Sequence, residues 1–128
     1  MVFNFGDIVY DALVEAVGGE IDVYPLVNPD ENGKLPFIVY RRSGYSPDYS
    51  KGLYAKIDTY YYSIAIVSDK YKDGIEIGDK VINAIMALTG KSIDGKHIQS
   101  AEVTNATESV GDDILFVQDI DFQIKITR

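Results

Sequence analysis

Two carboxylates near the end of the chain, Asp119 and Asp121, are the residues whose type and spacing could do chemistry. They lie in a stretch where apolar and polar side chains alternate, so they share one face of a predicted β-strand, about 7 Å apart. Two-carboxylate hydrolysis uses pairs of this kind. No histidine and no aromatic platform accompanies them on that face, and acidic residues are most often simply exposed. We therefore favour a solvated surface over a catalytic pair.

His97 is the only histidine in the chain, so a cluster of histidines around a metal ion is impossible. A general base built from His97 and an aspartate has no obvious nucleophile beside it. A small hydrolase or ligand-binding domain that uses Asp119, Asp121 or His97 is the alternative from another functional class. It requires these groups to meet in one concave pocket with shifted pKa values.

Two short segments imitate known motifs without their defining spacing. Thr89-Gly90-Lys91-Ser92 resembles the end of a phosphate-binding loop, but Ile85 stands where that loop needs a glycine, and a helix precedes it. Asp30-Glu31-Asn32-Gly33 starts like a calcium loop, but a strand follows where the bidentate glutamate belongs. We interpret the first segment as the end of a helix and the second as a turn. No catalytic, cofactor or metal site is therefore expected, and the chain is not predicted to be an enzyme.

Composition excludes several classes of protein. The 128 residues are 46% hydrophobic and carry a net charge of −8, which indicates a globular domain that repels nucleic acid over most of its surface. The chain has no cysteine, so disulfides and thiol chemistry are excluded. Neither a membrane-spanning run nor a signal peptide is evident, so we expect synthesis in the cytoplasm.

The elements that must position these residues follow from periodicity. The stretch Ile114–Thr127 alternates with a period of two, which predicts a strand about 46 Å long. A strand of that length is longer than the strands of most small sheets, so part of it could project beyond its own domain. This is a first indication of assembly with other chains. Its predicted core side is Ile114, Phe116, Gln118, Ile120, Phe122, Ile124 and Ile126. Its other side turns polar after Val117, with Asp119, Asp121 and Lys125 at the wetter end.

The rest of the chain supplies two helices and four further strands. Helical spacing predicts one helix from about Asn4 or Asp7 to Val17, and another from Asp69 to about Leu88 with Ser68 as its N-cap. Strands are predicted at Ile21–Val27, Pro36–Arg42, Leu53–Val67 and His97–Asn105, with loops at Ser43–Gly52 and Ala106–Asp113. This order predicts one α+β domain over residues 1–128, with a mostly antiparallel β-sheet and both α-helices packed on one face.

Tyrosines are concentrated in the middle of the chain. Eight of the ten lie between Tyr40 and Tyr71, and tyrosine with arginine dominates interface hot spots. The same tyrosines could instead complete a small core, and the residue types favour neither the core nor the interface interpretation. The residues predicted to contact another subunit or partner are Arg41, Arg42, Tyr45, Tyr49, Tyr54, Tyr60 and Tyr62.

Several strings in this order resemble the tail-completion or tail-terminator proteins of long-tailed bacteriophages and prophages. The strings are Leu13-Val14-Glu15-Ala16-Val17-Gly18, Val23-Tyr24-Pro25-Leu26, Leu35-Pro36-Phe37-Ile38-Val39-Tyr40, Tyr62-Ser63-Ile64-Ala65-Ile66-Val67 and Asp121-Phe122-Gln123-Ile124. The resemblance covers nearly the whole chain and consists of order and spacing, because none of the strings is a chemical signature.

The resemblance implies a structural protein without catalytic residues. Such proteins form a ring of identical subunits, usually a hexamer, on the head-proximal end of the tail tube. The implied partners are further copies of the chain, the major tail tube protein and the head connector proteins. DNA would pass through without being bound, which fits an acidic lumen face carrying Asp119 and Asp121. Assembly would take place in the bacterial host cytoplasm, and the protein would end in the virion tail. A head-to-tail connector or stopper protein has much the same pattern and stays open as an alternative.

Overall fold

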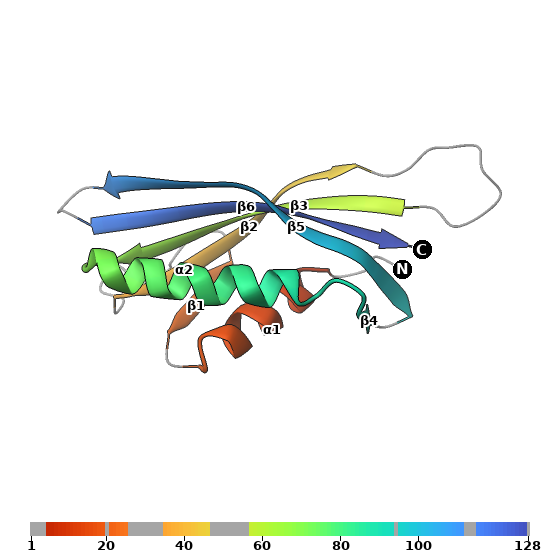
Figure 1. Ribbon diagram of the computed structural model, residues 1–128, viewed down its shortest axis with the longest axis horizontal. Helices are drawn as coiled ribbons and strands as arrows, with labels where there is room; N and C mark the ends of the chain where they lie inside the picture. The colour runs from red at the N-terminus through yellow and green to blue at the C-terminus, as the bar shows by residue number, and fades with distance from the viewer. Residues whose placement is uncertain are drawn as a thin grey trace.

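The computed structural model describes residues 5–19, 21–25, 35–46, 57–93, 95–111 and 115–127, with side chains from Ile8 onward. In these ranges the chain forms two α-helices and six β-strands (Figure 1). In order they are α1 (Phe5–Ala16), β1 (Asp22–Pro25), β2 (Phe37–Ser46), β3 (Ile57–Ser68), α2 (Tyr71–Met86), β4 (Ser92–Ile93), β5 (Lys96–Gly111) and β6 (Leu115–Thr127). Neither helix is long and apolar enough to cross a membrane.

The strands form one twisted sheet in the order β1-β2-β3-β6-β5-β4. Every neighbouring pair is antiparallel except β1 and β2, which run parallel. Figure 1 shows both helices on the same side of this sheet. The predicted fold class, an α+β arrangement with two helices on one face of a mostly antiparallel sheet, is confirmed.

The core lies between the helices and alternate residues of the two central strands. On β6 the residues at even positions from Gln118 to Ile126 are buried, and on β3 the buried positions are also even, from Asp58 to Ser68. Leu13 on α1 and Val81 on α2 are fully covered and face this surface. The period of two in the sequence therefore identified the core side of β6, because successive side chains of a strand point to opposite faces. It did not identify the core side of β3, because neither alternate set of that strand is wholly polar. Opposite the core side, Leu115 and Val117 are half-buried.

The predicted loop at Ala106–Asp113 is wrong for residues 106–111, which continue β5. Each of these residues pairs with β6, from Ala106 beside Ile120 to Gly111 beside Leu115. The segment is rich in serine, threonine and glutamate and reads as a turn by composition. Its backbone hydrogen bonds with β6 override that composition, and its side chains are exposed on both faces, so polar residues cost nothing there.

The other strand boundaries shift by a few residues. β2 continues through Ser46, four residues into the predicted loop, because Gly44, Tyr45 and Ser46 pair with β3 beyond a bulge after Arg42. The expectations for residues 47–56, which include the start of the predicted Leu53–Val67 strand, lie outside the described residues. The short strand β4 was not predicted.

The start of α2 also differs from the prediction. Lys70, not Ser68, is the N-cap residue, and its side chain makes no capping hydrogen bond. Ser68 is fully buried and its hydroxyl donates to the Lys70 carbonyl at 2.8 Å. A Cβ atom added to Gly74 would lie 3.0 Å from the Ser68 Oγ and 3.4 Å from the Gln118 Cγ. Gly74 thus lets the first turn of α2 lie directly on the sheet.

Substitution of the two α2 glycines tests this close approach. We expect Gly78→Ala to raise the free energy of unfolding by about 0.5–1 kcal/mol, because alanine favours a helix and the added Cβ meets ordinary contacts at 3.9 Å. We expect Gly74→Ala to lower it, because the buried Ser68 and Gln118 cannot move away. Urea denaturation followed by circular dichroism measures both. Equal stabilisation by the two alanines would contradict the packing of α2 described here.

Candidate interaction surfaces

The sheet has one face without helices, which we call the open face. It carries the odd-numbered residues of β3 and β6 and continues onto β2 and β5 through their register. One row across it runs from Arg41 on β2 through Ser63 and Asp121 to Asn105 on β5. No described helix covers these residues, so polar and charged side chains reach water there.

Asp119 and Asp121 both lie on this open face, as the alternation predicted. They line a shallow hollow of about 420 Å³ together with Val39, Arg41, Ser63, Ile64, Ala65 and Thr107. The Ser63 hydroxyl donates to the Asp121 Oδ1 at 2.7 Å, from a residue 58 positions away in the chain. The hollow therefore places an arginine, a serine and two carboxylates around one small space.

Partial burial sets the electrostatics of this hollow. The pKa of Asp119 is raised, first by loss of solvent around its carboxylate and second by the negative charge of Asp121. Two neighbouring carboxylates on a half-buried surface repel each other, and the protonated form of Asp119 relieves that repulsion.

The catalytic alternative requires His97 in the same place, and the fold separates them. His97 pairs with Thr127, whereas Asp121 is six residues further back on β6, which corresponds to about 20 Å along the strand. His97 is exposed, and its Nδ1 lies 3.2 Å from the Ser92 Oγ at the β4 end of the sheet. The three groups named for that alternative therefore do not form one site. Among the described residues no group of three metal-ligating side chains comes together either.

The residues predicted to make subunit contacts are divided between the two faces. Arg41 lies on the open face, whereas Arg42 pairs with Tyr62 and so lies on the helix side. Tyr45 is exposed and its ring lies 4.9 Å from that of Tyr60. Arg41, Arg42 and Tyr45 are accessible to a partner. Tyr49 and Tyr54 lie outside the described residues.

Tyr60 and Tyr62 belong to the core of this chain. Their exposed fractions are 9% and 3%, and Tyr62 stacks on Phe122 with ring centroids 5.6 Å apart. Burial raises the pKa of Tyr62 to about 12, against the opposing effect of the nearby Arg42. These two tyrosines thus offer little surface to a partner. The contact role of the seven residues stays a prediction that rests on Arg41, Arg42 and Tyr45.

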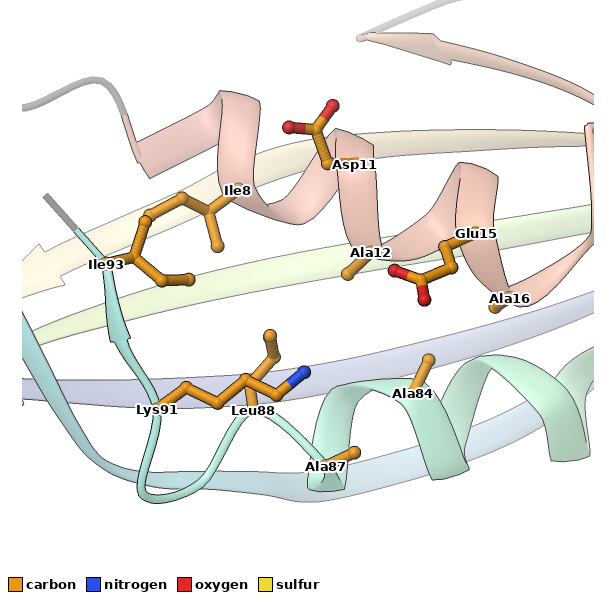
Figure 2. A pocket seen from close by; sticks show the side chains of 10 residues that line it. All are labelled: Ile8, Asp11, Ala12, Glu15, Ala16, Ala84, Ala87, Leu88, Lys91 and Ile93. Atoms are coloured by element: carbon orange, nitrogen blue, oxygen red, sulfur yellow. The ribbon is translucent and has the colours of Figure 1, made fainter.

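A second hollow, which sequence reasoning missed, lies between α1 and α2. It measures about 400 Å³ and has four alanines in its lining, together with larger apolar side chains and charged groups (Figure 2). The lining residues are Ile8, Asp11, Ala12, Glu15, Ala16, Ala84, Ala87, Leu88, Lys91 and Ile93. Figure 2 shows Glu15 and Lys91 reaching toward the space between the helices from opposite sides. The small alanine side chains at this boundary leave the space open, and no pattern in the sequence indicated it.

Comparison with solved structures identifies a shared fold. A chain of the "Virion of native gene transfer agent (GTA) particle" aligns with a TM-score of 0.66, covering 94% of this chain and 92% of that chain at 14% identity. A second solved chain aligns over 94% of each chain at 12% identity with a TM-score of 0.49. No family model and no curated protein matches the sequence. At 14% identity the likeness to the virion chain is one of fold.

The raised pKa of Asp119 predicts a pH dependence of stability. A carboxyl whose pKa is higher in the folded state than in the unfolded state contributes stability below its unfolded pKa, and this contribution is lost as pH rises through the folded pKa. The free energy of unfolding of Asp119→Asn, relative to that of wild type, should therefore be higher at about pH 7 than at about pH 3. Urea denaturation at both pH values measures the gain.

Val117→Ala is the matched control, because it changes a half-buried side chain on the same face of β6 by removing only methyl groups. Its stability difference from wild type should be the same at both pH values. An Asp119→Asn difference that is equally constant would contradict the electrostatics of the hollow.

Proposed function

We propose that this chain is a structural protein of phage-type particles that completes the tail. In this role identical subunits form a ring, a hexamer, on the head-proximal end of the tail tube. The ring ends tube polymerisation, contacts the major tail tube protein on one side and joins the head connector proteins on the other. Assembly takes place in the bacterial cytoplasm, and the finished protein is part of the virion tail.

The observation that carries this proposal is the fold shared with a chain of a gene transfer agent virion, over nearly the full length of both chains. The tail-terminator-like strings of the sequence point in the same direction. They fall on or beside α1, β1, β2, β3 and β6. A protein that works by shape needs surfaces rather than catalytic groups, and the separation of His97 from Asp119 and Asp121 fits that requirement.

Deletion of the coding sequence in a strain that produces the particles tests the role directly. If the chain ends tube growth, the deletion strain should contain tail tubes of uncontrolled length and heads without tails, and electron microscopy of lysates measures both. Expression of the wild-type chain from a plasmid should restore tails of uniform length. Mutant particles indistinguishable from wild type would contradict a structural role.

The same experiment separates the connector alternative from tail completion. A head-to-tail connector or stopper acts on the head, so its loss leaves tails of normal length that are not attached to heads. A catalytic or ligand-binding role outside assembly predicts normal particles. Tail completion, head-to-tail connection and a role outside assembly therefore each predict different particles in the micrographs.

The open face is the part of the chain that we assign to the lumen of the ring. Asp119 and Asp121 lie near the middle of β6 on this face, and a negatively charged wall repels DNA phosphates along the passage. The net charge of −8 gives the same sign to the molecule as a whole. In this role the two carboxylates do not bind DNA but repel its phosphates, so that DNA passes through the ring.

Charge reversal tests the lumen assignment. We expect the double substitution Asp119→Lys with Asp121→Lys to leave the chain folded, because both side chains lie outside the core, but to impair assembly or DNA delivery. Glu76→Lys with Asp79→Lys is the matched control, since it makes the same charge change on α2, away from the open face. Particle titre and DNA transfer measure the effect. Full activity of the Asp119/Asp121 variant would remove the lumen assignment.

A further inference from the structure

The sheet ends in two edges that no described strand covers along their full length. On one side β1 pairs only with Phe37–Tyr40 of β2, so the outer edge of residues 41–46 has no neighbouring strand in the described part of the chain. On the other side β4 pairs only with Lys96 and His97 of β5. Figure 1 shows the yellow end of β2 and the blue end of β5 along the side of the sheet away from the helices.

The start of β5 is engaged by the segment after α2, which limits the open part of that edge. Ile98 exchanges backbone hydrogen bonds with Gly90 and Lys91, and the Ala101 N–H donates to the Thr89 hydroxyl. Beyond Ala101, residues 102–111 pair with β6 on their inner side alone among the described elements. The side chains of residues 104–111 are all exposed.

These edges lack the usual protection against pairing. Proline and lysine block or repel a neighbouring strand, and neither occurs in residues 41–46 or 102–111. Bulges also protect edges, and β2 has one after Arg42 while β5 has them after Ile98 and Val103. Pairing is regular again from Gly44 to Ser46 on β2 and from Asn105 to Gly111 on β5, so most of each edge keeps the geometry of a regular strand. A long regular edge with unprotected backbone groups is a template for another strand.

The two edges carry opposite charge. Residues 41–46 contain Arg41 and Arg42 and no acid, whereas residues 102–111 contain Glu102 and Glu108 and no base. A basic edge is unusual in a chain with a net charge of −8. Its charge is complementary to that of an acidic surface. The same molecule provides that surface at the other end of its sheet.

Strand direction fits the same pairing. β2 is antiparallel to β3, β3 to β6 and β6 to β5, so β5 runs opposite to β2 within one chain. A second copy placed in the same orientation beside β5 therefore presents its β2 antiparallel to β5. Such a contact joins two different surfaces, so it repeats from copy to copy and forms a ring when the rotation closes.

We propose that residues 41–46 of one copy pair with the edge formed by residues 102–111 of the next copy, and that this edge-to-edge contact links the subunits. The inference rests on the proposed ring and names the contact that builds it. Arg41 and Arg42 direct the pairing because their charge is opposite to that of the neighbour's edge. On that edge Glu102 accepts a hydrogen bond from Gln123 and Glu108 from Tyr71, and both carboxylates remain exposed. The backbone hydrogen bonds of the added strand supply the affinity.

Charge-swapped variants test the contact in the purified full chain. The β2 variant carries Arg41→Glu and Arg42→Glu, and the β5 variant carries Glu102→Arg and Glu108→Arg. Each variant alone brings like charges together, so we expect its self-association to be weaker than that of wild type by about tenfold or more. An equimolar mixture restores opposite charges at every contact of an alternating ring, so association should recover. Sedimentation velocity up to about 1 mM protein measures all four samples.

A matched control changes the same charges elsewhere. Lys72→Glu with Lys80→Glu alters the exposed side of α2 and should leave association unchanged. Circular dichroism and thermal unfolding show whether each variant is folded, and recovery in the mixture cannot come from unfolded chains. A wild-type chain that stays monomeric at about 1 mM, variants that associate as wild type does, or a mixture without recovery would each overturn the proposal.

The outcome is independent of the test of the proposed function. If the deletion strain makes tubes of uncontrolled length but the charge swap has no effect, the tail role stands and the edge contact is wrong. If association follows the charge swap but the deletion strain makes normal particles, the edge contact stands and the tail role is wrong.

Discussion

The pairing of β3 with β6 is the interaction on which the rest of this structure depends. The two strands are in register from Ile57 beside Thr127 to Ser68 beside Phe116, and they form the centre of the sheet. Their even-numbered residues form a buried and largely apolar surface under both helices, with the polar Asp58, Ser68 and Gln118 toward its ends. Because every residue on that side is committed to the core, every residue on the other side is left for solvent or a partner.

That constraint explains how β6 can combine a mostly apolar core side with acids at adjacent positions. Ile120 and Phe122 are almost completely buried, while Asp119 and Asp121 between and beside them line the open hollow. A carboxylate costs little where water reaches it, and the hydroxyl of Ser63 supports Asp121 from the neighbouring strand. Partial burial of Asp119, together with the negative charge of Asp121, raises the pKa of the Asp119 carboxyl.

Much of the fold was predictable because it depends on local periodicity. Alternation located the core side of β6, and helical spacing located α1 and α2 to within a few residues at the described ends. The core side of β3 was decided only by the packing of the helices, because both of its faces carry apolar residues. The same alternation places Arg41 and Arg42 on opposite faces, although clustering in the sequence suggested one contact surface. Likewise, Tyr60 and Tyr62 share the core side of β3, so their concentration in the sequence reflected packing inside the chain.

The features that the sequence did not predict have a common cause, which is contact between segments far apart in the chain. Residues 106–111 are polar enough to form a turn alone, and become a strand because β6 supplies hydrogen-bond partners along their whole length. The hollow between α1 and α2 depends on how two helices separated by three strands come together. Neither arrangement has a local signal, since alanine and threonine are common in many other settings.

The sequence by itself determined the alternation of apolar and polar residues in β6 and the positions of the charges along the chain. With one histidine and no cysteine, it also excluded disulfides, thiol chemistry and a cluster of histidines. Only the tertiary structure decided which residues meet. Ser63 reaches Asp121, His97 lies far from both acids, and the ends of β2 and β5 remain as the two open edges among the described strands. The physical reason is that a side chain's direction follows from its own backbone, whereas its neighbours follow from the register between strands far apart in the chain.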